Sequence, residues 1–190
     1  MSFDFTKQEI LDWIDFLYKD LLNHRVYVGG FYFKFDQLNG FKKKLSVIEN
    51  EIRLANEKFN KNIQLLQKNA VKSLSAALEL QNKALLKEIN FQPVKIKAIN
   101  KNNEVIDLHC TYEELEHVVN QMSSCLESVE HFHKFLTEET ETLNEEDKKC
   151  YFVFINDLLT DVKDQLNGKI LPKKVIIEVK KNNLPKICKK

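Results

Sequence analysis

The residues best suited to hold a metal are two Glu-x-x-His pairs, Glu114 with His117 and Glu130 with His133. Di-iron bundles use this i, i+3 spacing, but their pairs project from helices that face one another. Here both pairs fall in one predicted helix, roughly 24 Å apart at 1.5 Å per residue, so they cannot share a dinuclear centre. His131 is a poor co-ligand for His133, because residues two apart on a helix point to nearly opposite sides. We expect no metal and no other cofactor.

A second candidate for chemistry is the segment Glu178-Val179-Lys180. Many nucleases have an acidic residue two positions before a lysine on a strand, where the carboxylate holds Mg²⁺ and the lysine supports the attacking water. A second acidic ligand is needed, and the nearest on a predicted strand, Asp107, is separated by two helices. An exposed strand of alternating charge therefore explains the segment better. A nuclease-like enzyme using Glu178 and Lys180 is the weakest of three functional alternatives, and we expect a protein that is not an enzyme.

The cysteines and the start of the chain indicate the compartment. The cysteines are widely spaced, form no CxxC pair and are expected to be free thiols, as in a reducing environment; they are Cys110, Cys125, Cys150 and Cys188. The segment MSFDFTKQEILDWIDF carries acidic residues where a secretory signal carries basic ones, and no apolar run is long enough to span a bilayer. We expect a cytoplasmic protein with no membrane span.

Charge is distributed unevenly along the chain. Residues 169–190 contain eight lysines and one glutamate, a local charge of +7 that leaves about −6 on the rest of a chain with net charge +1. Only Arg25 and Arg53 are arginines. Arginine is the better bidentate ligand for phosphates and bases, so this composition disfavours nucleic acid as a partner.

The N-terminal third predicts a helix followed by a hairpin. Thr6 and Glu9 have capping-box spacing, and apolar residues then recur at helical intervals to about Asn23. Residues 26–35 predict two strands joined by a two-residue turn at Gly29-Gly30, because a glycine pair favours such a turn and Phe31, Phe33 and Phe35 alternate along the second strand. One face of this hairpin is aromatic.

Residues 41–92 contain no proline or glycine and carry a near-heptad apolar stripe. The stripe consists of Leu45, Ile48, Ile52, Ala55, Phe59, Ile63, Leu66, Ala70, Leu74 and Ala77. One continuous helix would be roughly 75 Å long, so the segment either projects as a coiled-coil arm or breaks. Asparagine competes locally with helical hydrogen bonding, so the expected break points are Asn56, Asn60 and Asn62, or Asn69.

The remaining elements are a second hairpin and two helices. The hairpin covers residues 94–110, with its turn at 100–103, and a capping box formed by Thr111 and Glu114 starts the next helix. An acidic linker over 138–143 precedes a helix over 144–167 that Gly168 ends, and 175–179 form a short strand. The fold class is therefore mainly α with small β-hairpins, an α+β helical bundle with a long coiled-coil-like helix. Its expected parts are residues 1–143, a packed helix at 144–168 and a Lys-rich tail at 169–190.

This order of elements resembles a domain of unknown function found in phage and prophage tail proteins and tail-fibre-assembly proteins. The shared features, over about residues 9–143, are the hairpin VYVGGFYFKFD, the hairpin PVKIKAINKNNEVIDLHC and the helix start TYEEL. The chain departs from that family in its long 41–92 segment, its last helix, its basic tail and the absence of an early aromatic residue in the second hairpin.

The resemblance implies a non-enzymatic role in phage tail or tail-fibre assembly, as an adaptor or chaperone that acts through protein–protein contacts. The expected partner is a tail fibre or a host protein, with homo-oligomer formation through 41–92, in the host-cell cytoplasm or the virion. The residues expected to bind the partner, if exposed, are Tyr27, Phe31, Phe33, Phe35, Phe59, Ile63 and Leu66. A small phage or regulatory inhibitor that binds a host protein is the alternative.

Overall fold

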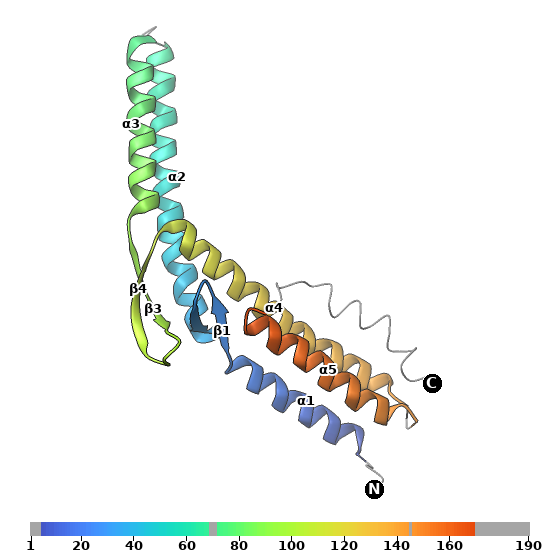
Figure 1. Ribbon diagram of the computed structural model, residues 1–190. Helices are drawn as coiled ribbons and strands as arrows, with labels where there is room; N and C mark the ends of the chain where they lie inside the picture. Colours follow the sequence, from blue (N-terminus) through green and yellow to red (C-terminus); the bar gives the residue numbers. More distant parts are fainter. Residues whose placement is uncertain (1–4, 69–71, 145, 170–190) are drawn as a thin grey trace. The chain divides into compact units, whose positions relative to one another are not determined.

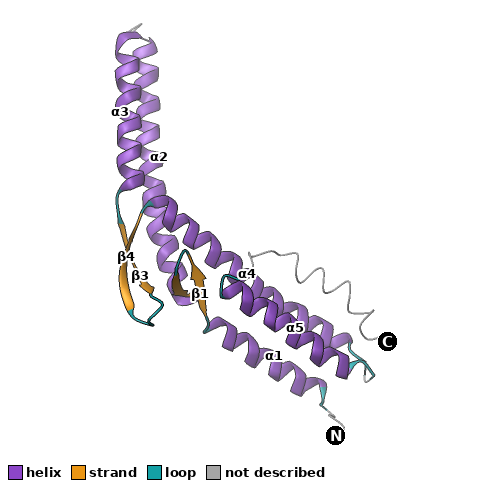
Figure 2. Ribbon diagram, viewed as in Figure 1, coloured by secondary structure: helices purple, strands orange, loops and turns teal. Residues whose placement is uncertain are grey.

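The computed structural model describes residues 5–68, 72–144 and 146–169. Their elements are α1 (Lys7–Leu22), β1 (Arg25–Val28), β2 (Phe31–Lys34), the 3₁₀ helix η1 (Phe35–Gln37), α2 (Leu38–Lys68), α3 (Lys72–Phe91), β3 (Val94–Ile99), β4 (Val105–Cys110), α4 (Tyr112–Thr142) and α5 (Lys148–Leu166). Helices dominate and the strands form antiparallel hairpins (Figure 2). The predicted mainly α class with small β-hairpins is confirmed.

The chain divides into two compact units. Unit 1 comprises Met1–Asp36 and Asn120–Lys190, and unit 2 comprises Gln37–Val119. The first hairpin, α1, α5 and most of α4 therefore belong to unit 1, whereas α2, α3 and the second hairpin belong to unit 2. Each unit is described by itself below.

Unit 1 is a bundle of α1, α4 and α5 (Figure 1). Thr6 caps α1 reciprocally with Glu9: the Thr6 amide donates to Glu9 Oε2 at 2.8 Å and the Glu9 amide donates to Thr6 Oγ1 at 3.2 Å. The predicted apolar stripe of α1 is buried at Ile10, Ile14, Leu17 and Leu21. Between α4 and α5, the buried Tyr151 hydroxyl donates to the Leu136 carbonyl at 2.7 Å. The predicted first helix and its capping box are confirmed.

The first hairpin, β1–β2, has the two-residue turn that its glycines predict. Gly29 and Gly30 have φ values of +59° and +95°, a combination that the type I′ turn requires at both central positions. The register pairs Val28 with Phe31 and Val26 with Phe33. Val26 and Phe33 are fully buried, so this pair anchors the hairpin in the core.

In unit 2, α2 and α3 lie side by side in opposite directions (Figure 1). The segment that could have formed one projecting helix is therefore a helical hairpin, in which α2 ends at Lys68 and α3 begins at Lys72. The predicted break at Asn56, Asn60 or Asn62 is wrong, because all three lie inside α2. The stripe of larger apolar residues continues through these asparagines, and packing against α3 outweighs their weak helix propensity. Asn69 and Ala70 lie outside the described residues.

The second hairpin, β3–β4, and the start of α4 match their predictions. Asn100 organises the turn, because its side-chain oxygen accepts hydrogen bonds from the Asn102 amide at 2.9 Å and the Glu104 amide at 3.0 Å. At the start of α4, the Thr111 amide donates to Glu114 Oε2 at 2.8 Å, and the Glu114 amide donates to Thr111 Oγ1 at 3.3 Å.

The prediction of a linker over 138–143 is wrong, because α4 continues to Thr142 and α5 begins at Lys148. No glycine or proline interrupts α4 there. Thr140 directs its hydroxyl to the Leu136 carbonyl at 2.7 Å, so its polar group is satisfied within the helix. Gly168, at φ +70°, follows the end of α5 as predicted. The predicted strand at 175–179 and the rest of the tail beyond residue 169 lie outside the described residues.

Candidate protein-binding surface

The main candidate surface is formed by exposed leucines on the α2–α3 hairpin of unit 2. Large apolar side chains normally supply the core, yet five leucines of these two helices are exposed. Their exposed fractions are 49% for Leu54, 58% for Leu65, 54% for Leu74, 69% for Leu80 and 45% for Leu85. Single exposed leucines are ordinary on a protein surface, and Leu80 lies six residues from Leu74, on another side of α3, so the arrangement of the other four decides their meaning.

Helical geometry places the four leucines on one face of the hairpin. Leu54 and Leu65 are eleven residues apart in α2, and Leu74 and Leu85 are eleven apart in α3. Eleven residues make about three full turns, so each pair projects from one side of its helix. Leu65 and Leu74 line the same groove, which shows that the two sides coincide. We call Leu54, Leu65, Leu74 and Leu85 the leucine face.

A groove of about 440 Å³ runs between the two helices on this face. Its lining is mostly apolar and consists of Asn62, Leu65 and Leu66 from α2 and Leu74, Ala77, Leu78 and Gln81 from α3. A groove flanked by leucines can accept the apolar side chains of another helix, which is how helix-in-groove recognition works.

Charged residues of both signs lie on the leucine face. Lys58 follows Leu54 by four positions and Lys61 precedes Leu65 by four, so both lysines lie on the same side of α2 as the leucines. Glu51 precedes Leu54 by three positions, and Glu88 follows Leu85 by three. Glu57 follows Leu54 by three positions and Lys68 follows Leu65 by three, so α2 carries both signs between its two leucines and a basic residue beyond Leu65.

The partner-binding residues predicted from the sequence fall into two groups. In α2, Phe59, Ile63 and Leu66 are half-buried, and Leu66 lines the groove. In the first hairpin, Tyr27 and Phe31 are half-buried, whereas Phe33 is 0% and Phe35 is 9% exposed. Phe33 and Phe35 are therefore core residues. They do not meet the condition of the prediction, which required the partner-binding side chains to be exposed. Tyr27 contacts Tyr32, with ring centroids 5.0 Å apart.

Sequence reasoning singled out only one of the four leucines of the face. Leu74 stood in the predicted apolar stripe, but Leu54, Leu65 and Leu85 did not, because a heptad search follows the side of α2 that packs on α3. The missed signal is the eleven-residue repeat, which recurs once in each helix.

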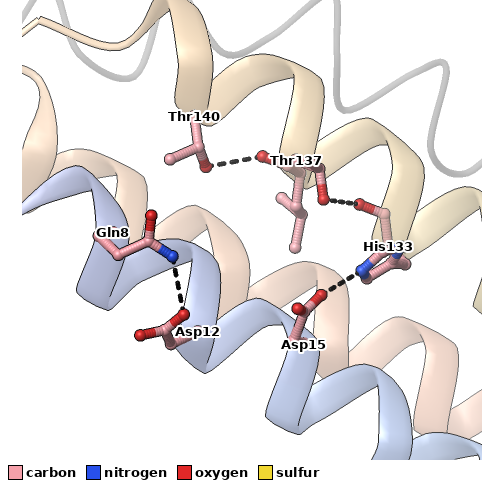
Figure 3. Close-up of polar contacts among 7 residues, drawn as sticks. Gln8, Asp12, Asp15, His133, Thr137 and Thr140 are labelled. Carbon is pink, nitrogen blue, oxygen red and sulfur yellow. Dashed lines mark hydrogen bonds and ion pairs between the residues drawn. The ribbon is translucent and has the colours of Figure 1, made fainter.

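The histidine that invited a metal hypothesis instead joins two helices of unit 1. His133 Nε2 of α4 lies 2.5 Å from Asp15 Oδ1 of α1 (Figure 3). The ring centroid of His133 is 4.4 Å from that of Tyr18. Thr137 donates its hydroxyl to the His133 carbonyl at 2.8 Å. Within the described ranges, no group of three or more His, Cys, Asp or Glu residues is arranged to hold a metal ion. Glu178 and Lys180, the proposed nuclease pair, lie outside those ranges.

Two buried cysteines and one aspartate of the second hairpin have shifted pKa values with clear causes. Burial raises the pKa of Cys110, and it raises that of Cys125 to about 11, so both are protonated thiols at neutral pH. Cys150 is half-buried. On β4, hydrogen bonds from Lys95 and Lys97 lower the pKa of Asp107 to about 2. Cys188 lies outside the described residues.

Comparison with known proteins returns no relative. No protein-family model matches the chain, no curated protein matches it, and no solved structure matches it. No helix within the described residues is sufficiently long and apolar to cross a bilayer.

Proposed function

We propose that this chain is a non-enzymatic adaptor that binds another protein through the leucine face of its α2–α3 hairpin. The observation that carries the proposal is the apolar groove between α2 and α3, which is lined by two of the four half-exposed leucines, Leu65 and Leu74. An exposed apolar groove with charged residues beside it is typical of protein interaction sites. Leu66, one of the partner-binding residues predicted from the sequence, also lines the groove.

A rough energy estimate shows what the partner must add. Fully burying a leucine is worth about 1.5–3 kcal/mol, so covering the exposed half of each side chain contributes about 1 kcal/mol. The four together give about 4 kcal/mol, which is comparable to the lower end of the cost of association. The partner must therefore also contact the groove or the charged residues of the face.

The biological setting follows from the resemblance to the phage tail and tail-fibre-assembly domain. On that basis, the adaptor acts in the cytoplasm of a host cell during tail assembly, and it can remain associated with the virion. A chaperone or adaptor for an elongated fibre requires a binding surface rather than a catalytic centre, and the leucine face provides one.

The experiment is affinity purification of the tagged full-length chain from cells in which it is naturally made, followed by mass spectrometry. We expect a fibrous tail component in stoichiometric amount from the wild type and its loss from the variant L65S/L74S. The matched control is Val153→Ser in α5, because Val153 is 59% exposed but lies in unit 1. A stable complex with a host enzyme would contradict the tail role and favour the inhibitor alternative. If L65S/L74S recovered as much of the tail component as the wild type, the assignment of the leucine face as the binding surface would be contradicted.

A further inference from the structure

We propose that the outer edge of β4 binds an extended segment of a partner protein, which adds to the β3–β4 hairpin as a further antiparallel strand. β4 is the last strand of its sheet and pairs with β3 on one side. Within the part of the chain that the structure describes, no strand lies on its other side. This site is separate from the leucine face, so the inference goes beyond the adaptor function proposed above.

The hydrogen bonds of the turn show which backbone groups of β4 face the outer edge. The Asn100 amide donates to the Glu104 carbonyl at 3.0 Å, so Glu104 directs its backbone groups toward β3. In an antiparallel pair, successive residues direct these groups alternately toward and away from the neighbouring strand. The N–H and C=O groups of Val105, Asp107 and His109 therefore point to the outer edge.

A hydrogen bond on β3 supports the same alternation. Lys97 is the register partner of Asp107, and its carbonyl accepts a hydrogen bond from the Gln37 side chain at 3.1 Å. The backbone groups of Lys97 thus point away from β4, as expected for a pair that exchanges no hydrogen bonds. Asp107 must then point its own backbone groups away from β3.

The outer edge is accessible and carries none of the usual protection. Val105 is 67% exposed, and Asp107 and His109 are also exposed. Natural edge strands are often protected by a lysine, a proline or a charge. β4 contains no lysine or proline, and its one carboxylate, that of Asp107, is held by Lys95 Nζ at 2.8 Å and Lys97 Nζ at 2.5 Å, both of β3. The edge therefore presents backbone donors and acceptors that an extended segment can pair with.

The apolar side of the hairpin indicates the side chains that the added strand needs. The register pairs Ile96 with Leu108 and Ala98 with Ile106. The two β3 residues are buried, at 2% and 0% exposed, whereas their β4 partners are only half-buried. An added strand covers Ile106 and Leu108 if it places apolar side chains beside them, and its alternate side chains then lie with Asp107 on the exposed side. The partner segment is therefore one in which apolar and polar residues alternate.

The chain itself supplies a probe with this alternation. A synthetic peptide with the sequence of residues 94–99, VKIKAI, alternates lysines with apolar residues. Paired antiparallel on the outer edge, its lysines lie opposite His109 and Asp107, and their amides point toward β4. We expect this peptide, titrated into the isotope-labelled full-length protein and followed by NMR, to slow hydrogen exchange at the amides of Val105, Asp107 and His109.

Backbone methylation of the peptide tests the main-chain hydrogen bonds without changing the protein. Methylation of both lysine nitrogens removes the donors that face β4 and should weaken binding about tenfold or more, since each lost hydrogen bond contributes about 1 kcal/mol. The matched control carries the methyl groups on the third and fifth nitrogens of the peptide, which face away from β4. Equal weakening by both modifications would refute strand pairing.

Two adjacent variants of β4 test the side-chain requirement. Ile106→Lys places a charge on the apolar side of the edge and should also weaken peptide binding about tenfold, a loss of about 1.4 kcal/mol. The matched control Val105→Lys adds the same charge on the exposed side and should bind the peptide nearly as well as the wild type. A loss of equal size in both variants would contradict the requirement for an apolar residue beside Ile106.

The variant L65S/L74S separates this site from the leucine face. It should bind the peptide as the wild type does, because neither leucine belongs to the second hairpin. Loss of peptide binding in L65S/L74S would place the peptide in the groove and refute the edge site. A wild type whose Asp107 amide exchanges at the same rate at every peptide concentration would also refute it, whereas the adaptor function is decided independently by the affinity purification.

Discussion

Leu65 of α2 and Leu74 of α3 line the same groove, and each exposes more than half of its surface. Two large apolar side chains from neighbouring helices are therefore accessible to a partner at one site, because neither is fully buried in the core. One side of α2 packs on α3, and another side carries exposed leucines. The apolar pattern of the sequence does not distinguish these two sides.

Replacing Leu65 and Leu74 by serine should reduce binding with little effect on folding. Exposed substitutions usually change the free energy of unfolding by about 0.5 kcal/mol or less. We expect the urea midpoint of L65S/L74S to stay close to that of the wild type while partner recovery is lost. A large fall in the midpoint would show that these leucines belong to the core.

Phe33 should act as a core residue, although it was predicted as a binding residue. Its side chain is fully buried, so Phe33→Ala should lower the free energy of unfolding by about 3–5 kcal/mol. Phe31→Ala, at a half-buried position two residues earlier, should cost much less. Urea unfolding of both variants measures the difference, and similar losses for the two would contradict the assignment of Phe33 to the core.

Gly168 should not tolerate a side chain. Its φ is +70°, and a Cβ atom there would lie 2.7 Å from Tyr27 Cδ1. Gly168→Ala should therefore destabilise the protein by about 1–3 kcal/mol through backbone strain and crowding. If Gly168→Ala lowers the free energy of unfolding less in the Tyr27→Ala background than in the wild type, crowding contributes to the loss. If Gly168→Ala alone caused no loss of stability, the account would be refuted.

Asp107 should make the second hairpin sensitive to strong acid. Its pKa falls from an ordinary 3.8 to about 2, so the folded state binds protons less readily than the unfolded state. The stabilisation is present above about pH 4 and is lost as the pH falls toward 2. The Asp107 carboxyl signal followed by NMR should titrate near pH 2, and Lys95→Ala with Lys97→Ala should return it toward the ordinary value. A titration near pH 4 in the wild type would contradict the two lysine contacts.

Sequence patterns predicted correctly those features of the fold that depend on residues close together in the chain. Both capping boxes, the Gly29-Gly30 turn and the Gly168 stop depend on residues within a few positions of one another, so the sequence alone reveals them. The fold-back of residues 41–92 depends on α2 packing against α3. Of the two predicted break points, the cluster Asn56, Asn60 and Asn62 was wrong because it lies inside α2, whereas the alternative, Asn69, lies outside the described residues. The binding surface was identified only in part, since burial of Phe33 and exposure of Leu65 are decided by tertiary packing that spacing does not encode.

The most direct test of the leucine face is site-specific photo-crosslinking in cells. A photoreactive amino acid placed at position 65, 74 or, as the control, 153 is irradiated in the cell, and products are identified by mass spectrometry. We predict a discrete crosslinked protein, a tail component, at positions 65 and 74 and none at 153. Absence of a discrete product at both positions of the face, with the chain expressed and folded, would contradict the claim that this surface binds protein.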